Sequence, residues 1–148
     1  MEKDVFVKVR GLHIAADTDS DIPVEVISKG SYYLKNGKHY LLYEEAMEGF
    51  NDVTKNRLTF TEDRLEITKS GVINAHLLFE RDKRNSTFYY TPFGSITVGI
   101  DTKNMDISIT DDLIKINISY ALEMNNRLVS DCSIYMEITG RSNKNFRL

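Results

Sequence analysis

Apolar and polar residues alternate one by one along almost the whole chain. In the clearest stretch, Ile114, Ile116 and Ile118 are separated by single polar residues, and Tyr120 and Leu122 continue the same spacing. A period of two puts successive side chains on opposite faces of a β-strand, so one face is buried and the other is wet. No stretch shows the i, i+3, i+4, i+7 spacing of apolar residues that an amphipathic helix needs. The sequence therefore predicts an all-β fold.

Short turn signals divide this alternation into consecutive segments. Strands joined by short turns favour an antiparallel meander, and a long meander closes to remove its exposed edges. We therefore predict a single antiparallel meander barrel of about 8–10 strands. It covers residues 1–139, and residues 140–148, where the alternation is lost, form a C-terminal tail. Besides the hairpins described next, strands are expected at residues 4–14, 57–61, 64–69, 72–81, 86–91 and 95–101, with turns at residues 62–63, 82–85 and 92–93.

Turn chemistry fixes how the strands pair. Asn36-Gly37 is the strongest hairpin signal, because these residues supply the positive φ angles of a type I′ turn. A turn at Asp111-Asp112 sets Ile109 opposite Ile114, and a turn at Pro92-Phe93 aligns Tyr89 with Ile96. Counting outward from Asn36-Gly37 gives the inward face of its two strands: Val24, Val26, Tyr32, Leu34, Leu41, Tyr43 and Met47.

The turn after Met124 can be read with two lengths. A two-residue turn at Asn125-Asn126 would put Leu128 on the polar face of the sheet. A three-residue loop sets Met124 opposite Leu128 and Tyr120 opposite Cys132. We therefore predict the three-residue loop.

Composition narrows the class of protein. The chain has 148 residues, of which 28% are charged and 41% hydrophobic, as in a single soluble domain with its own core. The net charge of -3 and the lack of a basic run argue against nucleic-acid binding. A single cysteine, Cys132, rules out an internal disulfide and fits a reducing compartment. Because the N-terminus is charged and no apolar run is long, we expect a cytoplasmic protein that contacts no membrane.

Several short motifs follow one another in an order and spacing that resemble a known family. They are Tyr40-Leu41-Leu42-Tyr43-Glu44-Glu45, then Ser70-Gly71 leading to Phe79-Glu80, then Thr91-Pro92-Phe93-Gly94-Ser95-Ile96. Over roughly residues 3–138 the chain resembles the YwiB-like family of small, uncharacterised bacterial β-barrel proteins. The resemblance implies a calycin-like barrel, the architecture that lipocalins and fatty-acid-binding proteins share. It implies no activity and assigns no functional residue.

Polar residues whose register points inward are the candidates for a binding site. Glu45 follows Tyr43 on the inward face, and Lys69 falls on the inward face of its strand. A buried charge must be paired or hydrated, so these two side chains are candidates to pair with each other. Tyr32, Tyr43 and Tyr89 also point inward, and aromatic rings with hydroxyl tips suit a ligand wall. Alternatively, the two charges lie in water at the barrel rim and the tyrosines are ordinary core residues.

No pattern indicates an enzyme, a metal site or a cofactor. Residues 17–21 open like a calcium loop, but Ile22 and Ser28 stand where such a loop needs Gly and Glu, so a solvated connection fits better. The three histidines show no paired ligand spacing. A nucleophile elbow and a phosphate-binding Gly-rich loop are also lacking. We therefore assign no catalytic residue, no metal ligand and no cofactor. Catalysis by Glu45 with a tyrosine stays open, because catalytic groups from separated strands leave no spacing pattern in a sequence.

Two functions remain open from the sequence. The first is a non-catalytic barrel that binds a small, partly apolar ligand in its interior. An open cavity lined in part by polar groups would indicate this function. The second is a structural or protein–protein interaction module with a filled core, as a monomer or a homodimer, and its mark is a dry interior with an exposed apolar patch. The wall and orienting groups of the first are Tyr32, Tyr43, Glu45, Lys69 and Tyr89.

Overall fold

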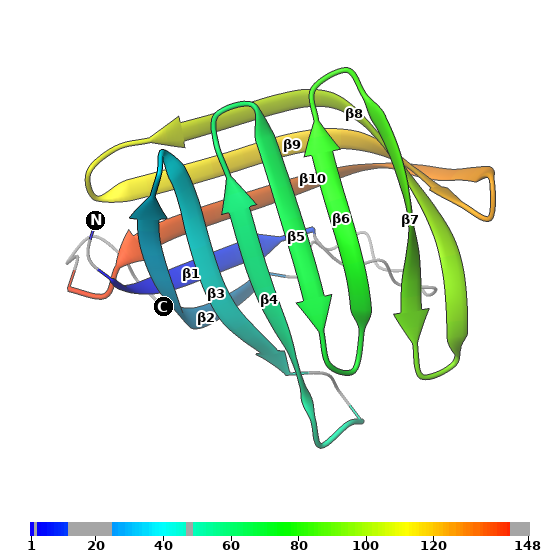
Figure 1. Cartoon of the computed structure of the whole chain (residues 1–148), viewed down its shortest axis with the longest axis horizontal. Helices are drawn as coiled ribbons and strands as arrows, with labels where there is room; N and C mark the ends of the chain where they lie inside the picture. The colour runs from blue at the N-terminus through cyan, green and yellow to red at the C-terminus, as the bar shows by residue number, and fades with distance from the viewer. Residues whose placement is uncertain (2, 12–24, 47–48, 143–148) are drawn as a thin grey trace.

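The computed structural model describes residues 1, 3–11, 25–46 and 49–142, and within them the chain forms ten β-strands. Each strand pairs antiparallel with its neighbours in the chain, and β1 pairs with β10, so the sheet closes into a barrel (Figure 1). The predicted all-β meander barrel is therefore confirmed. In this part of the chain no helix has the length and apolar character of a membrane span. The strands are β1 (Asp4–Arg10), β2 (Glu25–Lys35), β3 (Lys38–Ala46), β4 (Val53–Phe60), β5 (Arg64–Ser70), β6 (Asn74–Glu80), β7 (Arg84–Thr91), β8 (Gly94–Ile109), β9 (Leu113–Met124) and β10 (Arg127–Gly140).

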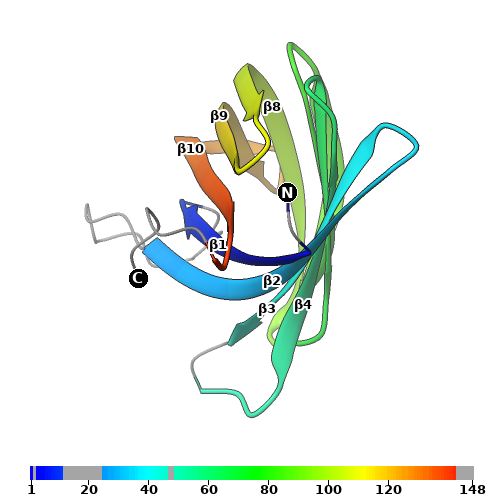
Figure 2. The same ribbon diagram turned by 90° about the vertical axis from the view of Figure 1, so that its left-hand side faces the viewer.

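The barrel has two walls. Strands β3 to β7 form the wall that faces the viewer in Figure 1, and β1, β8, β9 and β10 cross behind them. Figure 2 shows β2 curving between the two walls. The turns after β2, β4 and β6 lie at the upper end of the front wall in Figure 1, and those after β3, β5 and β7 lie at its lower end. Upper and lower end are used below in this sense.

Inward side chains of the front wall form rows that run across the strands. In the upper row, His39, Phe60, Leu65 and Phe79 are direct neighbours on β3 to β6. In the middle row, Tyr32 is followed by four aliphatic side chains that are at most 1% exposed. Valines and isoleucines of the back wall pack with these two rows in the core. The four aliphatic residues of the middle row are Leu41, Leu58, Ile67 and Leu77.

Most of the pairings predicted from turn chemistry are confirmed. Asn36 and Gly37 both have positive φ angles, 53° and 76°, and the strands on either side pair in the predicted register. Ile109 lies opposite Ile114, and Tyr89 lies opposite Ile96. A β-turn therefore sets the register wherever its residues favour one backbone conformation.

Burial follows the predicted face except near the strand ends. Tyr32, Leu41 and Tyr43 are buried as expected. Leu34 is 59% exposed, because it lies next to the turn where few side chains remain to cover it, and Val26 is also exposed. Two other residues assigned to this face, Val24 and Met47, lie outside the described residues.

The predicted three-residue loop after β9 is wrong. The structure has a two-residue turn, in which Asn125 and Asn126 both adopt positive φ angles, 52° and 66°. Met124 therefore pairs with Arg127 instead of Leu128, and Leu128 points outward. Asparagine adopts this left-handed conformation more readily than most residues, so two consecutive asparagines suit a type I′ turn.

A bulge corrects the register a few residues later. The pairing of β10 with β9 shifts between Leu128 and Ser130, so that Tyr120 still lies opposite Cys132 as predicted. A similar shift between Thr102 and Asn104 occurs within β8. The extra residues therefore lie inside strands rather than in loops.

Several strand boundaries differ from the prediction. Strand β8 continues beyond the predicted segment 95–101 to Ile109, because the bulge bends the strand without ending it. Strand β1 ends at Arg10, β4 begins already at Val53, and β7 begins at Arg84. The acidic segment at residues 17–21 lies outside the described residues. After β10, Arg141 is held on the barrel, because its side chain donates to the carbonyl oxygens of Val5 and Gly30 at 3.1 Å each.

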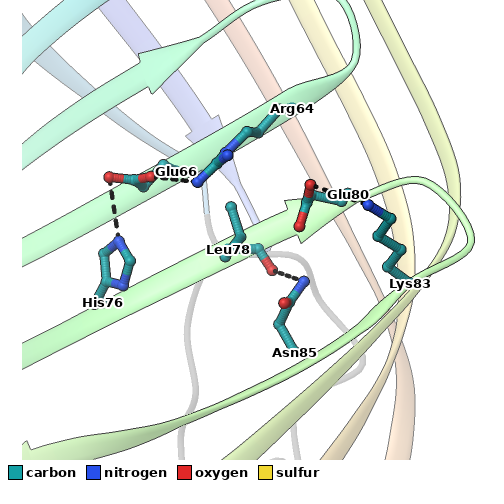
Figure 3. Close-up of polar contacts among 7 residues, drawn as sticks. All are labelled: Arg64, Glu66, His76, Leu78, Glu80, Lys83 and Asn85. Atoms are coloured by element: carbon teal, nitrogen blue, oxygen red, sulfur yellow. Dashed lines mark hydrogen bonds and ion pairs between the residues drawn. The ribbon is translucent and has the colours of Figure 1, made fainter.

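The seam between β6 and β7 is the weakest pairing in the barrel. Backbone pairing there is limited to Asn74 with Tyr90 and Ala75 with Tyr89, near the lower end. Further up, the side-chain amide of Asn85 donates to the Leu78 carbonyl oxygen at 3.4 Å, in place of a backbone donor (Figure 3). The Leu78 backbone therefore faces a partly open seam.

This seam predicts uneven hydrogen exchange along β6. Successive residues of an antiparallel strand direct their amides to opposite neighbours, so the Leu78 amide faces β7 and the Leu77 amide faces β5. We expect the Leu78 amide to exchange roughly tenfold or more faster than the Leu77 amide, because local opening of the seam costs less than unfolding. Amide exchange followed by NMR measures both rates in one sample, and equal rates would show that the seam is closed in solution.

Candidate functional site

The next set of inward side chains, below the middle row, is largely polar. Tyr43, Asn56, Lys69, Ala75 and Tyr89 are direct neighbours across β3 to β7. We call these five residues the polar row. It arises because each strand has an inward position at this height and its alternation places that side chain in the barrel.

A buried ion pair lies at the centre of the polar row. The Lys69 ammonium donates to Asn56 Oδ1 at 2.8 Å and to Glu45 Oε1 at 3.1 Å, and Asn56 Nδ2 donates to the same carboxylate oxygen at 3.5 Å. The Lys69 side chain is 3% exposed and that of Glu45 is 18% exposed. The predicted pairing of Glu45 with Lys69 is therefore present. The alternative is wrong in placing Lys69 in water at the rim, whereas its interpretation of the tyrosines as ordinary core residues stays open.

Part of the polar row is slightly more exposed to solvent than the aliphatic residues of the middle row. Tyr43, Ala75 and Tyr89 retain 7–8% exposure, whereas the aliphatic residues of the middle row retain at most 1%. Ala75 also has only a methyl group between the longer side chains of Lys69 and Tyr89. The polar row is thus the part of the core that combines charge, hydrogen-bonding groups and contact with solvent.

The tyrosines of the polar row are held in their neutral form. Burial, together with a smaller effect of the negative charge of Glu45, raises the pKa of Tyr89 from 10.0 to about 12. The same two causes, in the same order, raise the pKa of Tyr43. Burial also raises the pKa of Tyr120, on the back wall, with further contributions from Cys132 and Tyr89. All three hydroxyls therefore stay protonated and can donate hydrogen bonds at neutral pH.

These shifts predict a loss of stability in alkali. The pKa of Tyr89 is higher in the folded chain than in the unfolded one, so its contribution is complete below pH 10.0 and is lost as the pH rises through about 12. The unfolding free energy of the wild-type chain should fall as the pH rises through this range. In the Tyr89→Phe variant this fall should be smaller by roughly 2 kcal/mol. Urea denaturation of both proteins at intervals across the range tests this. Parallel curves for the two proteins would contradict the assigned burial of the hydroxyl.

Tyr32 does not join the polar row. Its hydroxyl is 2.6 Å from Nδ1 of His39, and the two rings stack with centroids 5.9 Å apart. His39 also stacks on Phe60, with centroids 5.1 Å apart. Tyr32 therefore belongs to an aromatic group nearer the upper end. Of the five predicted site residues, four come together: Tyr43, Glu45, Lys69 and Tyr89.

Sequence reasoning missed Asn56. The predicted strand begins at residue 57. The alternation that places Leu58 and Phe60 inside the barrel continues back to Asn56 and Thr54. Both of these polar residues are fully buried, and the Thr54 hydroxyl accepts a hydrogen bond from the Ile73 amide at 3.2 Å. Extending the alternation by two steps would have found them. Among the described residues, no group of three or more His, Cys, Asp and Glu side chains is placed to hold a metal ion.

Comparison with known proteins identifies the fold and the family. The chain is similar to the ywiB protein from Bacillus subtilis, whose crystal structure matches it with a TM-score of 0.74 and 19% sequence identity over 95% of this chain and 93% of that one. At this identity the likeness shows the fold alone. No curated protein matches the sequence significantly. The family model described as a domain of unknown function, DUF1934, matches residues 7–136, which is most of the chain. The chain therefore belongs to the DUF1934 family and is a small β-barrel of the YwiB-like type.

Proposed function

We propose that this barrel is a non-catalytic protein that binds a small, partly apolar molecule at the polar row. The network of Lys69, Glu45 and Asn56 is the observation that carries this proposal. Stability does not account for such a network, because apolar residues of similar volume replace buried ion pairs with neutral or favourable effect in many proteins. Tyr43 and Tyr89, whose pKa values are raised by burial and by Glu45, lie beside this network, and perturbed titratable groups are typical of functional sites.

The hydrogen-bonding groups define the kind of ligand. Tyr43 and Tyr89 supply hydroxyl donors, and two of the three ammonium hydrogens of Lys69 are already used by Asn56 and Glu45. Donors thus predominate, and the aliphatic middle row lies directly above them. The best-matched ligand has an apolar body and a carbonyl or hydroxyl oxygen that accepts these hydrogen bonds.

A titration with 2-naphthol, which has an apolar body and one hydroxyl group, tests this proposal. We expect the NMR amide shifts to concentrate on the strands of the polar row. Ala75→Leu fills the smallest position in that row and should weaken binding roughly tenfold or more. His76→Leu places the same new side chain on the outer face of the same strand and should leave binding unchanged. Equal binding by a folded Ala75→Leu variant, or shifts confined to the outer face, would contradict the proposal.

A second candidate function is self-association, which a group of exposed aromatic side chains favours. The side chains of Phe50, Phe88, Tyr90 and Phe93 are between 40% and 91% exposed. They contact each other in pairs, with ring centroids 6.4 Å apart for Phe50 and Phe93 and 6.0 Å apart for Phe88 and Tyr90. Exposed apolar patches are typical of protein interfaces. If this candidate is right, sedimentation velocity detects a dimer that Phe93→Ser disrupts, whereas a monomer at high concentration excludes it.

A further inference from the structure

We propose that the outer face of β3, β4 and β5 binds a small phosphate monoester. A groove with a volume of about 330 Å³ lies there, on the opposite side of the sheet from the polar row. Its volume is within the range of small-molecule sites. The residues that line it are Lys38, Tyr40, Arg57, Thr59, Phe60, Thr61, Arg64 and Glu66.

Strand register brings three cationic side chains to this groove. Tyr40, Thr59 and Glu66 are direct neighbours across β3, β4 and β5 and form its floor. Each of these strands carries a cation two residues away on the same outward face, namely Lys38, Arg57 and Arg64. Because β4 runs opposite to β3 and β5, Arg57 approaches the floor from below while Lys38 and Arg64 approach from above. The cations therefore surround the floor.

The groove carries more positive than negative charge. Glu66 is its one carboxylate among the lining residues, and it is engaged by Arg64 at 3.0 Å and by His76 at 3.2 Å (Figure 3). Partial burial acts to raise the pKa of Glu66, but the hydrogen bonds and charges of His76 and Arg64 outweigh it and lower that pKa. Within the described residues, neither Lys38 nor Arg57 takes part in an ion pair.

This charge pattern matches a phosphate monoester. Such a group carries about 1.5–2 negative charges at neutral pH and has three strong acceptor oxygens. A guanidinium group presents paired donors that fit phosphate oxygens, and lysine adds a point charge. The hydroxyls of Thr59 and Thr61 supply further donors at the groove. Tyr40, stacked on Tyr33 with centroids 4.8 Å apart, offers an aromatic surface for the rest of the molecule.

Isothermal titration of the full chain with phenyl phosphate at low ionic strength tests the proposal. We expect phenyl phosphate to bind at least tenfold more tightly than phenol, because phenol lacks the charged group that the cations of this groove contact. Arg57→Ala should weaken binding roughly tenfold, because a hydrogen bond to a charged group is lost. Lys115→Ala, which removes an exposed lysine on β9, should leave the affinity unchanged. Arg57 is exposed, so its replacement leaves the core intact.

Three results would overturn the proposal. They are no binding of phenyl phosphate by the wild-type chain, an affinity that Arg57→Ala leaves unchanged, and tighter binding of a short single-stranded DNA than of phenyl phosphate. The last result would mark a nucleic-acid surface instead of a small-molecule site. Loss of 2-naphthol binding in Ala75→Leu with phenyl phosphate binding retained would separate this groove from the polar row.

Discussion

Phe79→Ala lowers the free energy of unfolding by about 4 kcal/mol, whereas Phe93→Ala changes it by less than about 0.5 kcal/mol. The two phenylalanines differ in burial. Phe79 is 1% exposed in the upper row and packs edge-on against Tyr120, with centroids 5.2 Å apart. Phe93 is 91% exposed at the tip of a turn. Truncating the buried ring leaves a cavity between the two walls, because a close-packed core relaxes only in part.

Urea denaturation followed by circular dichroism measures both changes. Phe79→Leu serves as an intermediate variant and should cost less than Phe79→Ala, because it refills part of the cavity. Similar losses for Phe79→Ala and Phe93→Ala would mean that Phe79 is not a core residue of a filled barrel.

Lys69→Met lowers the free energy of unfolding by about 3 kcal/mol, because it removes the buried ammonium group that donates to both Glu45 and Asn56. This value is at the low end for a broken buried ion pair, since the Glu45 side chain is 18% exposed and keeps some hydration. The double variant Glu45→Leu with Lys69→Met removes both charges. It should unfold with a free energy close to that of the wild type, or higher.

The four proteins of this double-mutant cycle separate pairing from packing. A coupling energy of at least about 1 kcal/mol between positions 45 and 69 is expected for a direct ion pair. If the double variant loses as much stability as the sum of its single changes, the two side chains do not interact, and the proposed site loses its central feature.

The sequence predicts the faces of the strands well because alternation is a local property. Ile114, Ile116 and Ile118 are all fully buried, as their spacing predicts. Asn36-Gly37 fixes the pairing of β2 with β3 because its backbone conformation permits one register. Glu45 and Lys69 were placed inside the barrel by counting along two separate hairpins, and they meet at 3.1 Å.

The bulges could not be predicted from the sequence. A bulge adds one residue to a strand and needs no characteristic side chain, so the segments around Lys103 and Val129 read like ordinary strand or loop. For this reason the sequence predicts one residue too many in the turn after β9. The extra residue that keeps Tyr120 opposite Cys132 lies in β10 and not in the predicted loop.

Features that depend on several strands at once were also missed. The side chain of Tyr32 points inward as predicted. Its hydroxyl group contacts His39, and the alternation of side chains along a strand does not predict such a contact. The cations of the outer groove come from three strands, so no basic run marks them in the sequence. Contacts between strands that are distant in sequence depend on how the barrel closes. No local pattern in a single sequence therefore predicts them.

Native mass spectrometry of the protein purified from its own cells, compared with its denatured mass, tests most directly whether the polar row binds a small molecule. The account predicts a non-covalent adduct that is lost on denaturation and is missing from the Ala75→Leu variant prepared in the same way. A bare protein in both preparations, or an adduct that the Ala75→Leu variant retains in full, would contradict binding at the polar row.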